Sequence, residues 1–297
     1  MAGHILRDSF MPVDYKEGRA LKSCSIRVSS HRRYGFFIYF SMIFYFSGTG
    51  NSKWVANQLS KEQKEELFFI PDLLRNETLE FCLRRDEKIG FVFPIYSWSP
   101  PTIVLHFIHQ LSLKGYNGQY IFFVCSCGDD TGLAQQVFTK ALRRKGWECH
   151  AGFSVTMPNN YVLLPGFDVD CKELEQKKLA ESIPTLKKIN TLIAGREHVF
   201  SCHEGSVPFI KTRIINPLFN RFQMSPENFY ATDACIGCKR CERNCPMKNI
   251  TVVEGKPVWE KNCTSCLACY HVCPRQAVQY GKRTKGKGQY FNPDSDY

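Results

Sequence analysis

A cysteine pattern that occurs twice near the carboxyl end constrains the fold of this chain more than any other feature. The stretches CIGCKRCERNCP, residues 235–246, and CTSCLACYHVCP, residues 263–274, both read C-x2-C-x2-C-x3-C-P. Structural zinc uses two C-x2-C pairs and has no third cysteine at the same pitch. A disulfide framework belongs to short secreted chains and would not repeat so strictly. The pattern therefore favours iron–sulfur clusters over these two alternatives.

The spacing within each run also predicts which cysteines share a cluster. The first three thiolates of a run surround one 4Fe-4S cluster, and the fourth lies too far around the turn and binds the other cluster. The expected ligands are Cys235, Cys238, Cys241 and Cys273 for the first cluster, and Cys263, Cys266, Cys269 and Cys245 for the second. Pro246 and Pro274 turn the chain away after the last ligand of each run. In every ligand and in both prolines, residues 228–281 resemble the bacterial two-cluster ferredoxins, which are small α+β domains.

The composition limits the compartment and the partners. Fifteen cysteines occur in 297 residues, and eight of them lie in the last quarter of the chain, which indicates a metal-binding domain in a reducing, cytoplasmic compartment. Lysine and arginine exceed aspartate and glutamate by eleven, so anionic partners such as an acidic electron carrier are favoured. No basic stripe is interleaved with aromatic residues, and no nucleic-acid partner is expected. No window approaches the roughly 18 uncharged apolar residues of a membrane span.

From Met42 onward, apolar strand-like runs alternate with amphipathic helices. Strands are expected at 42–46, 66–71, 88–96, 118–126 and 147–155. Helices are expected at 52–62, 101–111 and 132–146. Five apolar strands separated by helices of about a dozen residues indicate a parallel sheet that is covered on both faces. The first domain is therefore expected to be an α/β fold with a doubly wound, five-stranded parallel sheet in the order 2-1-3-4-5.

The stretch SGTGNS, residues 47–52, joins the first expected strand to the first expected helix. Gly48 and Gly50 let the backbone turn its N–H groups inward, and the hydroxyls of neighbouring residues add donors. The positive end of the helix dipole points at the same place, so the loop is expected to bind a phosphate. No G-K-[ST] closes the loop as in a Walker motif, and the third glycine of a dinucleotide fingerprint is missing. A plain tight turn is the alternative.

This loop resembles the phosphate loop of the flavodoxins, whose pattern is [ST]-x-T-G-x-[ST]. The matching positions are Ser47, Thr49, Gly50 and Ser52. The resemblance implies that the loop holds the phosphate of FMN and that residues 94–101 and 125–132 flank the flavin ring. The flavin contacts expected from it are Ser47, Gly48, Thr49, Gly50, Asn51, Ser52, Pro94, Tyr96, Trp98, Cys127 and Gly128. The second flanking loop departs from ordinary flavodoxins, because it has Cys-Gly-Asp in place of a Tyr-bearing segment.

Some of these side chains also have a simpler interpretation. For Tyr96 and Trp98 it is the packing of a surface loop, and for Cys127 it is a buried, unreactive thiol. Asp129 and Asp130 are expected to cap the helix that follows them rather than to contact a ligand.

The order of domains follows from these motifs. We expect a poorly ordered extension at 1–41, a flavodoxin-like domain at 42–167, a helical bridge at 168–227, a ferredoxin-like domain at 228–281 and a disordered tail at 282–297. Two adjacent arginines before the apolar run at 36–40 hint at a twin-arginine export signal, but that run leads into the first strand, and the cleavage site of such a signal would fall inside the phosphate loop. Export is therefore not expected, and translation is expected to start at Met42.

A flavodoxin-like domain followed by a two-cluster ferredoxin is similar to a family of fused flavodoxin–ferredoxin proteins, found mainly in anaerobic bacteria and archaea. The resemblance covers about 42–280 and implies an electron-transfer flavoprotein that passes single electrons between two 4Fe-4S clusters and FMN. Its partner would be a redox protein, or a small acceptor that it reduces as an oxidoreductase. Two alternatives remain: a redox-sensing or docking module, and a ferredoxin fused to a domain without flavin. No second nucleotide fingerprint supports direct use of NAD(P)H.

Overall fold

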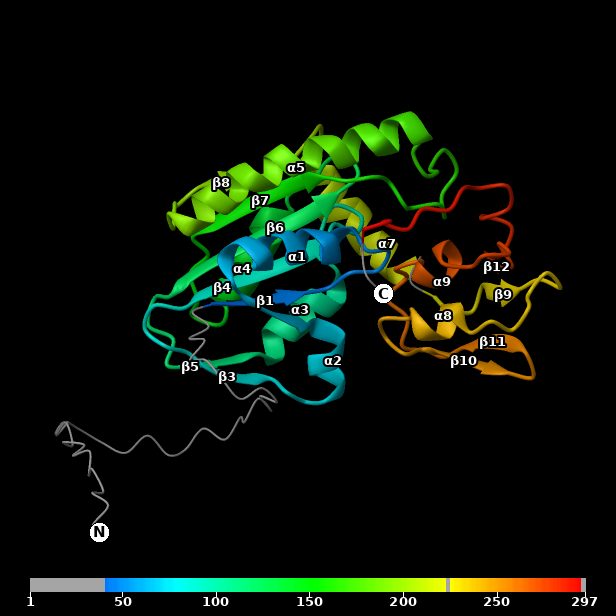
Figure 1. Ribbon diagram of the computed structural model, residues 1–297, viewed down its shortest axis with the longest axis horizontal. Coiled ribbons are helices and arrows are strands. Elements are labelled where there is room, and N and C mark those ends of the chain that lie inside the picture. Colours follow the sequence, from blue (N-terminus) through cyan, green and yellow to red (C-terminus); the bar gives the residue numbers. More distant parts are fainter. Residues whose placement is uncertain (1–40, 223–224, 295–297) are drawn as a thin grey trace, which may run out of the picture. The chain divides into compact units, whose positions relative to one another are not determined.

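The computed structural model describes residues 41–222 and 225–294. Three expectations concern the residues before this range: the extension at 1–41, the start of translation at Met42 and the lack of export. The structure describes one residue of the expected extension, Ser41, which begins the first strand. The described residues form a sheet-containing part and a smaller cysteine-rich part (Figure 1).

A six-stranded parallel sheet forms the centre of the first part. Its strands are β1 (Ser41–Tyr45), β2 (Glu66–Phe69), β4 (Lys88–Pro94), β6 (Tyr120–Cys127), β7 (Ala151–Thr156) and β8 (Phe200–Ser201). The order β2-β1-β4-β6-β7 is the order 2-1-3-4-5 expected for the five longer strands. The expected number of strands misses β8, because a strand of two residues shows no alternation that a sequence pattern can reveal.

The second expected strand is shorter than the sequence predicts. It ends at Phe69, because Ile70 and Pro71 open a short helix. Proline suits the first turn of a helix, where its missing N–H group has no partner to lose. The short elements between β2 and β6 that lie outside the large sheet are the helix α2 (Ile70–Arg75) and the parallel strands β3 (Glu80–Cys82) and β5 (Ser112–Lys114); the longer helix α3 (Thr102–Gln110) precedes β5.

Successive side chains of β1 point to opposite faces of the sheet, as the two-residue period of a strand requires. Phe44 is fully buried on the face covered by α3 (Thr102–Gln110) and α4 (Ala134–Arg143). Its ring centroid lies 5.1 Å from that of Phe107 in α3. The preceding residue, Ile43, is buried in the core on the other face. The sheet is therefore apolar on both sides, which explains why its strands read as continuous apolar runs.

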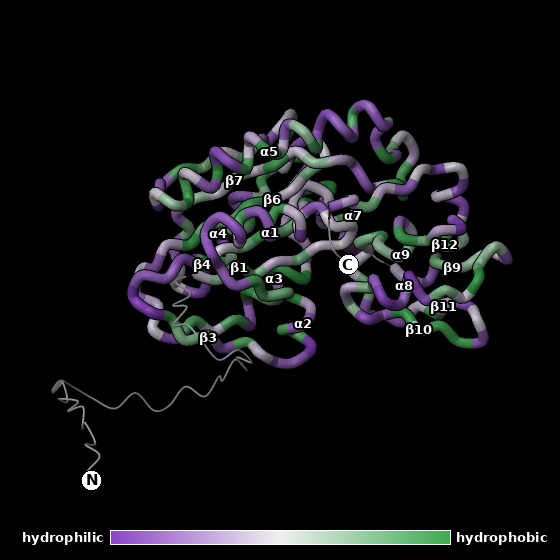
Figure 2. The backbone as a smooth tube through the Cα atoms, viewed as in Figure 1, coloured by the Kyte–Doolittle hydropathy of each residue, from purple (hydrophilic) through white to green (hydrophobic). Residues whose placement is uncertain are grey.

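The second face is covered by α1 (Asn51–Gln63) and by α5 (Lys172–Ala194), which lies in the stretch expected as a bridge. The side chains of α5 that join the core of this face are Leu186, Ile189 and Ile193. Figure 2 shows hydrophilic and hydrophobic residues alternating along α5, as expected for a helix with one buried face. α5 thus completes the helical layer of the sheet, and the boundaries of the domains stay a prediction.

The rest of the expected bridge is a second helical stretch, which we call the helical segment 207–222. It consists of α6 (Pro208–Ile210), a π-helical turn η1 (Lys211–Ile215) and α7 (Asn216–Phe222). Its buried residues, Thr212 and Asn216, are polar. Neither this segment nor any other helix in the described residues is long and apolar enough to cross a membrane.

The cysteine-rich part is a small α+β unit, as expected. Its elements are β9 (Phe229–Ala231), α8 (Arg240–Arg243), β10 (Ile250–Val253), β11 (Lys256–Trp259), α9 (Ala268–His271) and β12 (Val278–Tyr280). β9 pairs with β12 and β10 pairs with β11, both in antiparallel fashion. Each short helix carries the third cysteine of a run, Cys241 in α8 and Cys269 in α9.

The expected disorder of the tail is wrong for residues 282–294. Tyr290 and Asn292 are buried. The Tyr290 hydroxyl donates a hydrogen bond to Asn51 Oδ1 at 2.6 Å, and the Asn292 N–H group donates to the Thr49 carbonyl at 2.9 Å. The hydrophilic composition of this stretch predicts exposure, whereas specific hydrogen bonds to the loop after β1 give it a fixed position.

Candidate cofactor sites

The loop between β1 and α1 has the properties of an anion site. Gly50, with φ at 98°, is the left-handed residue that precedes α1, and Ser47, Thr49 and Ser52 are buried. α1 has no acidic residue in its first turn. The positive end of its dipole is therefore not neutralised from within the helix, and this place favours negative charge.

One buried hydroxyl of this loop is unpartnered. Ser47 Oγ makes no hydrogen bond to any residue in the ranges 41–222 and 225–294. Its neighbours are bonded within the protein: Ser52 Oγ lies 2.7 Å from Ser126 Oγ, and Asn51 Nδ2 donates to the Pro158 carbonyl at 3.1 Å. Buried hydroxyls nearly always have a partner, so the Ser47 hydroxyl fits an oxyanion ligand such as a phosphate.

A pocket with about 520 Å³ of empty space, open solvent included, lies beside this loop. Nine of the eleven expected flavin contacts line it: Ser47, Gly48, Thr49, Asn51, Ser52, Pro94, Tyr96, Cys127 and Gly128. Gly50 and Trp98 are not part of the lining. The pocket is built at the carboxyl ends of β1, β4, β6 and β7, the edge where ligands of doubly wound sheets bind.

The sequence pattern did not reveal a further wall of this pocket, the segment MPNNY at 157–161. Asn160 Nδ2 in this segment donates a hydrogen bond to Thr49 Oγ1 in the phosphate loop. The segment follows β7 directly, so its place after the last long strand was a signal that it belongs to the site.

Trp98 packs under the helical segment 207–222 instead of lining the pocket. Ser97 and Trp98 both have positive φ, 47° and 61°, a conformation that costs free energy in residues other than glycine. Asn216 Nδ2 donates to the Ser97 carbonyl at 3.0 Å, and Thr212 Oγ1 donates to the Trp98 carbonyl at 2.9 Å. The Lys211 ammonium lies 5.3 Å from the centre of the Trp98 ring. The helical segment 207–222 therefore holds the strained turn at Ser97 and Trp98. Tyr96, the residue before this turn, lines the pocket.

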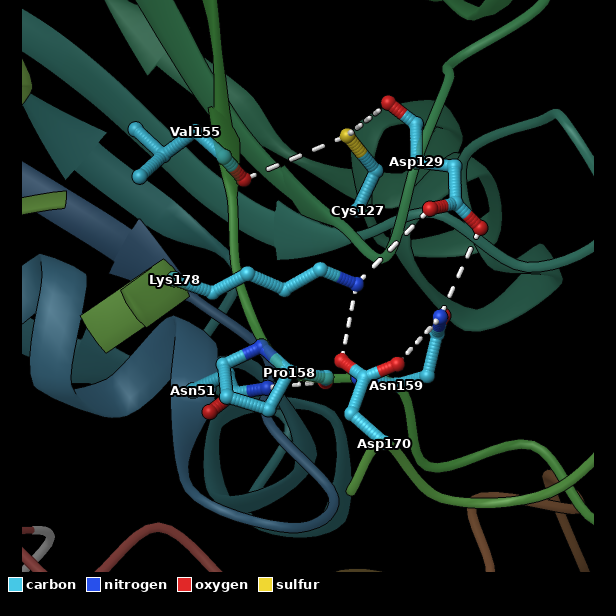
Figure 3. Close-up of polar contacts among 8 residues, drawn as sticks. All are labelled: Asn51, Cys127, Asp129, Val155, Pro158, Asn159, Asp170 and Lys178. Atoms are coloured by element: carbon cyan, nitrogen blue, oxygen red, sulfur yellow. Dashed lines mark hydrogen bonds and ion pairs between the residues drawn. The ribbon is translucent and has the colours of Figure 1, made fainter. Parts of the chain in front are cut away.

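Cys127 has the environment of an unreactive thiol. It is buried at the end of β6, and burial raises its pKa to about 12. Its Sγ lies 3.7 Å from the Asp129 carbonyl and 3.9 Å from the Val155 carbonyl (Figure 3). The thiolate that nucleophilic or redox chemistry needs is therefore disfavoured.

Gly128 allows an asparagine to approach the pocket closely. A Cβ at this position would lie 1.6 Å from Asn159 Oδ1, so a side chain would displace Asn159. Asn159 is held from behind by Asp170, because its backbone N–H group donates to Oδ2 at 3.0 Å and its Nδ2 donates to Oδ1 at 3.1 Å. Asn159 is thus a positioned hydrogen-bonding group in the pocket wall.

Asp170 in turn pairs with Lys178 of α5, whose Nζ lies 2.7 Å from Asp170 Oδ2 and 3.7 Å from Asp129 Oδ1 (Figure 3). Lys178 is 6% exposed. Burial alone would raise the pKa of Asp170, but hydrogen bonds from Lys178 and Asn159 lower it overall. The charged form of Asp170 is therefore favoured, and Lys178 pairs with it behind the Gly128 loop.

The expected helix cap at Asp129 and Asp130 is wrong. The residue that precedes α4 is Leu133, and no side chain caps this helix. Asp130 instead forms an ion pair with Lys211, and Asp129 accepts a hydrogen bond from Asn159 Nδ2 at 3.4 Å. Both aspartates thus bind residues far along the chain and do not bind the N–H groups at the start of α4.

The eight cysteines of the two runs line two separate cavities. The first is lined by Cys235, Cys238, Cys241 and Cys273, and the second by Cys245, Cys263, Cys266 and Cys269. This grouping is the one that the spacing predicts, with the fourth cysteine of each run in the cavity of the other. All eight are free thiols. Four cysteines around one cavity are the donor set of a 4Fe-4S cluster.

Burial raises the pKa of several of these thiols. The pKa of Cys241 is raised to about 11 and that of Cys266 to about 12, in both cases chiefly by burial. Iron offsets this effect because it binds the thiolate and stabilises its charge. No three Cys, His, Asp or Glu side chains in the described part of the chain lie close enough to share one metal ion. A 4Fe-4S cluster binds each thiolate to a different iron atom.

The phosphate loop touches the wall of the second cavity. A Cβ at Gly48 would lie 2.8 Å from the Cβ of Cys266 and 3.2 Å from the Tyr96 hydroxyl. Only a residue without a side chain permits this approach. The backbone of Gly48 therefore lies between the pocket, which it lines, and a cysteine of the second cavity.

His271 of α9 is hydrogen-bonded both to the pocket segment 157–161 and to the tail. Its Nε2 lies 2.7 Å from the Asn160 carbonyl, and its Nδ1 accepts a hydrogen bond from the Tyr290 N–H group at 3.1 Å. Nε2 therefore carries the proton. Burial lowers the pKa of His271 to about 4, so the ring is neutral at physiological pH.

Comparison with known proteins identifies the cysteine-rich part. Residues 234–278 match the family model described as a 4Fe-4S dicluster domain. The chain joins a flavodoxin-like sheet to a 4Fe-4S dicluster domain. The second of these is an iron–sulfur electron-transfer domain, and the matched range contains all eight cysteines that line the two cavities.

Two curated relatives match the chain over short stretches. One is a subunit of the ion-translocating oxidoreductase complex of Methanosarcina acetivorans, which is 44% identical over 46 residues, 15% of this chain and 17% of that protein. The uncharacterized protein MJ0749 of Methanocaldococcus jannaschii is 37% identical over 51 residues, 17% of this chain and 20% of that protein. The chain thus spans a fifth or less of the length of these relatives.

A solved structure covers the sheet-containing part. The Trp repressor binding protein from Bacillus subtilis is 17% identical and aligns over 48% of this chain and 94% of its own, with a TM-score of 0.31. A score of this size does not establish a shared fold. The flavodoxin-like assignment rests on the strand order and on the place of the phosphate loop after β1.

Proposed function

We propose that this chain transfers electrons between two 4Fe-4S clusters and an FMN held in the pocket beside the phosphate loop. The observation that carries the proposal is the contact of Gly48 with Cys266. It brings the expected flavin loop against an expected cluster ligand. Because electron transfer weakens steeply with distance, a direct contact between the two binding sites is what such a protein requires.

The proposed cluster ligands are the cysteines that line the two cavities. Cys235, Cys238, Cys241 and Cys273 hold the first cluster, and Cys245, Cys263, Cys266 and Cys269 hold the second. The clusters supply one-electron chemistry, and FMN supplies an acceptor for one or two electrons. The cysteines would fix the clusters in place, and the buried positions of Cys245 and Cys269 would keep water away from the second one.

The proposed flavin contacts divide between phosphate and ring. The Ser47 hydroxyl and the backbone N–H groups at the start of α1 hold the phosphate. Tyr96 and Asn159 line the remainder of the pocket and contact the ring, and Gly128 leaves the space for Asn159.

The two cavities have different roles in this proposal. Cys266 of the second cavity contacts the phosphate loop, whereas every residue that lines the first cavity belongs to the range 235–278. The first cavity has Lys239, Arg240 and Arg275 in its lining, and Ile236 beside them is 65% exposed. A basic rim around an apolar contact suits a negatively charged electron carrier, so we propose that an acidic redox protein exchanges electrons here.

Anaerobic purification, followed by measurement of iron, sulfide and flavin, tests the proposal. We expect about eight iron atoms, about eight sulfides and about one FMN per chain. Zinc in place of iron would contradict the proposal outright. Full clusters without flavin would favour the alternative of a ferredoxin fused to a flavin-free domain. If all cofactors are present but a reduced acidic ferredoxin fails to bleach the flavin absorbance, the result would favour the alternative of a redox-sensing or docking module.

A further inference from the structure

The helical segment 207–222 turns its polar side chains inward and its apolar side chains outward. Thr212 is 4% exposed and Asn216 is 8% exposed. The large apolar side chains that are 40% to 63% exposed are Val207, Phe209, Ile210, Ile214, Ile215, Leu218 and Phe222. A surface helix of a globular protein ordinarily has the opposite arrangement. An exposed apolar surface of this extent marks an interaction site.

The inward residues are explained by the turn at 96–98, whose carbonyls they bind. Within the described residues, nothing comparable covers the outward side chains. The helix is thus anchored to the wall of the cofactor pocket by one face and presents the other to its surroundings.

The charge on the outward face is positive. Residues 207–222 contain no Asp or Glu, and Arg213 and Arg221 are exposed. The third basic residue, Lys211, is paired with Asp130 and lies over the Trp98 ring. The two exposed arginines therefore set the charge that an approaching surface meets.

We propose that this face binds the surface of an anionic phospholipid bilayer. Apolar side chains with basic residues at their flanks are the pattern of helices that lie in the membrane interface. The arginines attract anionic headgroups, and the phenylalanine, isoleucine and leucine side chains enter the boundary with the acyl chains. The overall excess of eleven positive charges acts in the same direction.

Two other occupants fit the observations less well. A second copy of this chain would bring the same arginines together, and like charges at an interface oppose association. A transient electron-transfer partner uses a small contact that is no more apolar than the rest of the surface. Seven large exposed apolar side chains within sixteen residues exceed what such a contact needs.

Sedimentation of the cofactor-loaded protein with lipid vesicles tests the proposal. We expect it to bind vesicles that contain phosphatidylglycerol, to bind pure phosphatidylcholine vesicles less, and to dissociate as salt is added. Leu218→Ser should weaken binding about tenfold, because a large apolar side chain no longer enters the bilayer. The double variant Arg213→Glu/Arg221→Glu should weaken binding to the anionic vesicles about tenfold and leave binding to the neutral ones unchanged.

Two matched variants on α5 and after α4 serve as controls. Ile183 is 50% exposed, close to the 53% of Leu218, and Ile183→Ser should leave vesicle binding unchanged. Arg144 is exposed, and Arg144→Glu should also leave it unchanged. Circular dichroism and cofactor absorbance establish that each variant is folded.

Several outcomes overturn the proposal. One is that the protein stays in the supernatant with anionic vesicles, and another is that the Leu218 and arginine variants bind as the unmodified chain does. A dimer in light scattering that Leu218→Ser converts to a monomer would assign the face to a second copy. Tight capture of a purified acidic ferredoxin, lost in Leu218→Ser, would assign it to a protein. Iron and flavin are measured on the same samples, so an absent flavin leaves this result intact.

Discussion

Gly48 approaches Cys266 so closely that a side chain at Gly48 would begin 2.8 Å from the cysteine Cβ. The glycine belongs to the loop after the first strand, and the cysteine belongs to the second ferredoxin-like run. The pocket beside the phosphate loop and the second cysteine cavity thus meet at one backbone position.

Replacement of Gly48 by alanine should disturb this contact. The added Cβ cannot be accommodated without a shift of the loop or of the cysteine, and we expect a loss of about 1–3 kcal/mol in the free energy of unfolding. We also expect slower reduction of the flavin by the clusters. Urea unfolding measures the first effect, and stopped-flow absorbance of the loaded protein measures the second.

Gly195→Ala is the matched control for this change. Gly195 has φ at −74°, and the nearest atom to an added Cβ would lie at 3.4 Å, an ordinary contact. This variant should change stability by no more than about 0.5 kcal/mol and should not alter the rate of flavin reduction. If Gly48→Ala and Gly195→Ala had the same stability and the same rate of flavin reduction, the packing of Gly48 against Cys266 would be looser than the structure indicates.

Single replacements of the fourth cysteines test the ligand sets. Cys273→Ala should remove the first cluster and Cys245→Ala the second, so each should lower the iron content from about eight to about four atoms per chain. Electron paramagnetic resonance of the reduced protein should show a different remaining cluster in the two variants. Cys171→Ala, at an exposed cysteine outside the runs, should keep all the iron. If both variants retained the same cluster, the crossed assignment would be wrong.

Ser47→Ala should weaken the binding of FMN by about tenfold or more, because a hydrogen bond to a charged phosphate is lost. Riboflavin lacks the phosphate, so its affinity should be unchanged by the same replacement. Fluorescence titration of the flavin-free protein with both ligands measures the difference. A buried serine on α5, Ser182, provides the control variant Ser182→Ala. Equal weakening for both flavins would place the Ser47 hydroxyl elsewhere than at the phosphate.

Lys178→Met should destabilise the protein by about 3–5 kcal/mol, because it leaves the carboxylate of Asp170 buried without its cation. The double variant Lys178→Met/Asp170→Asn should recover most of this loss. Lys177, the neighbouring residue, is exposed, and Lys177→Met should change stability by less than about 0.5 kcal/mol. Urea unfolding at pH 7 measures all three, and a neutral effect of Lys178→Met alone would refute the role of the pair.

Glu65 should make stability depend on pH. Burial raises its pKa from 4.5 to about 7, although Lys88 lies 3.4 Å away and opposes the shift. The folded state therefore binds the proton of Glu65 more tightly than the unfolded state does. The stability that protonated Glu65 contributes is fully present below pH 4.5 and is lost as the pH rises through about 7. Glu65→Gln should lack this loss and gain up to roughly 3 kcal/mol relative to the unmodified chain between pH 4.5 and pH 8.

Urea unfolding across this pH range checks the Glu65 prediction. Glu181→Gln, at an exposed position of α5, is the control and should follow the unmodified chain. A constant difference between Glu65→Gln and the unmodified chain at all pH values would show that folding does not shift the pKa of Glu65.

The features that were predicted correctly depend on patterns within short stretches of the sequence. The parallel sheet covered on both faces followed from continuous apolar runs such as the one around Phe44, because strands buried on both faces leave no polar alternation. The ligand sets of the clusters stay a prediction, and the eight cysteines line two cavities in the groups that their spacing favours. An apolar run and a cysteine spacing are each complete within a short stretch of the chain, although the strands and cysteines that come together lie far apart in the sequence.

The features that the sequence did not predict depend on partners far along the chain. Tyr290 and Asn51 are separated by 239 residues, so no local pattern could show that the hydrophilic tail is ordered. Asn159 and Lys178 acquired their roles only when α5 brought a cation behind the pocket. The two-residue strand β8 is likewise held by its pairing with β7 and not by its own sequence.

The hydrogen bonds from the tail to Asn51 have a consequence for biosynthesis. Asn51, at the end of the loop after β1, leaves the ribosome 239 residues before its partner Tyr290 and 241 residues before its partner Asn292. A nascent chain can build the sheet while the loop still lacks these contacts. The cysteines of both runs also emerge before the tail does, so the cysteine-rich part can fold before the tail forms its hydrogen bonds to the loop, and the loop has all of these partners only after residue 292 has been made.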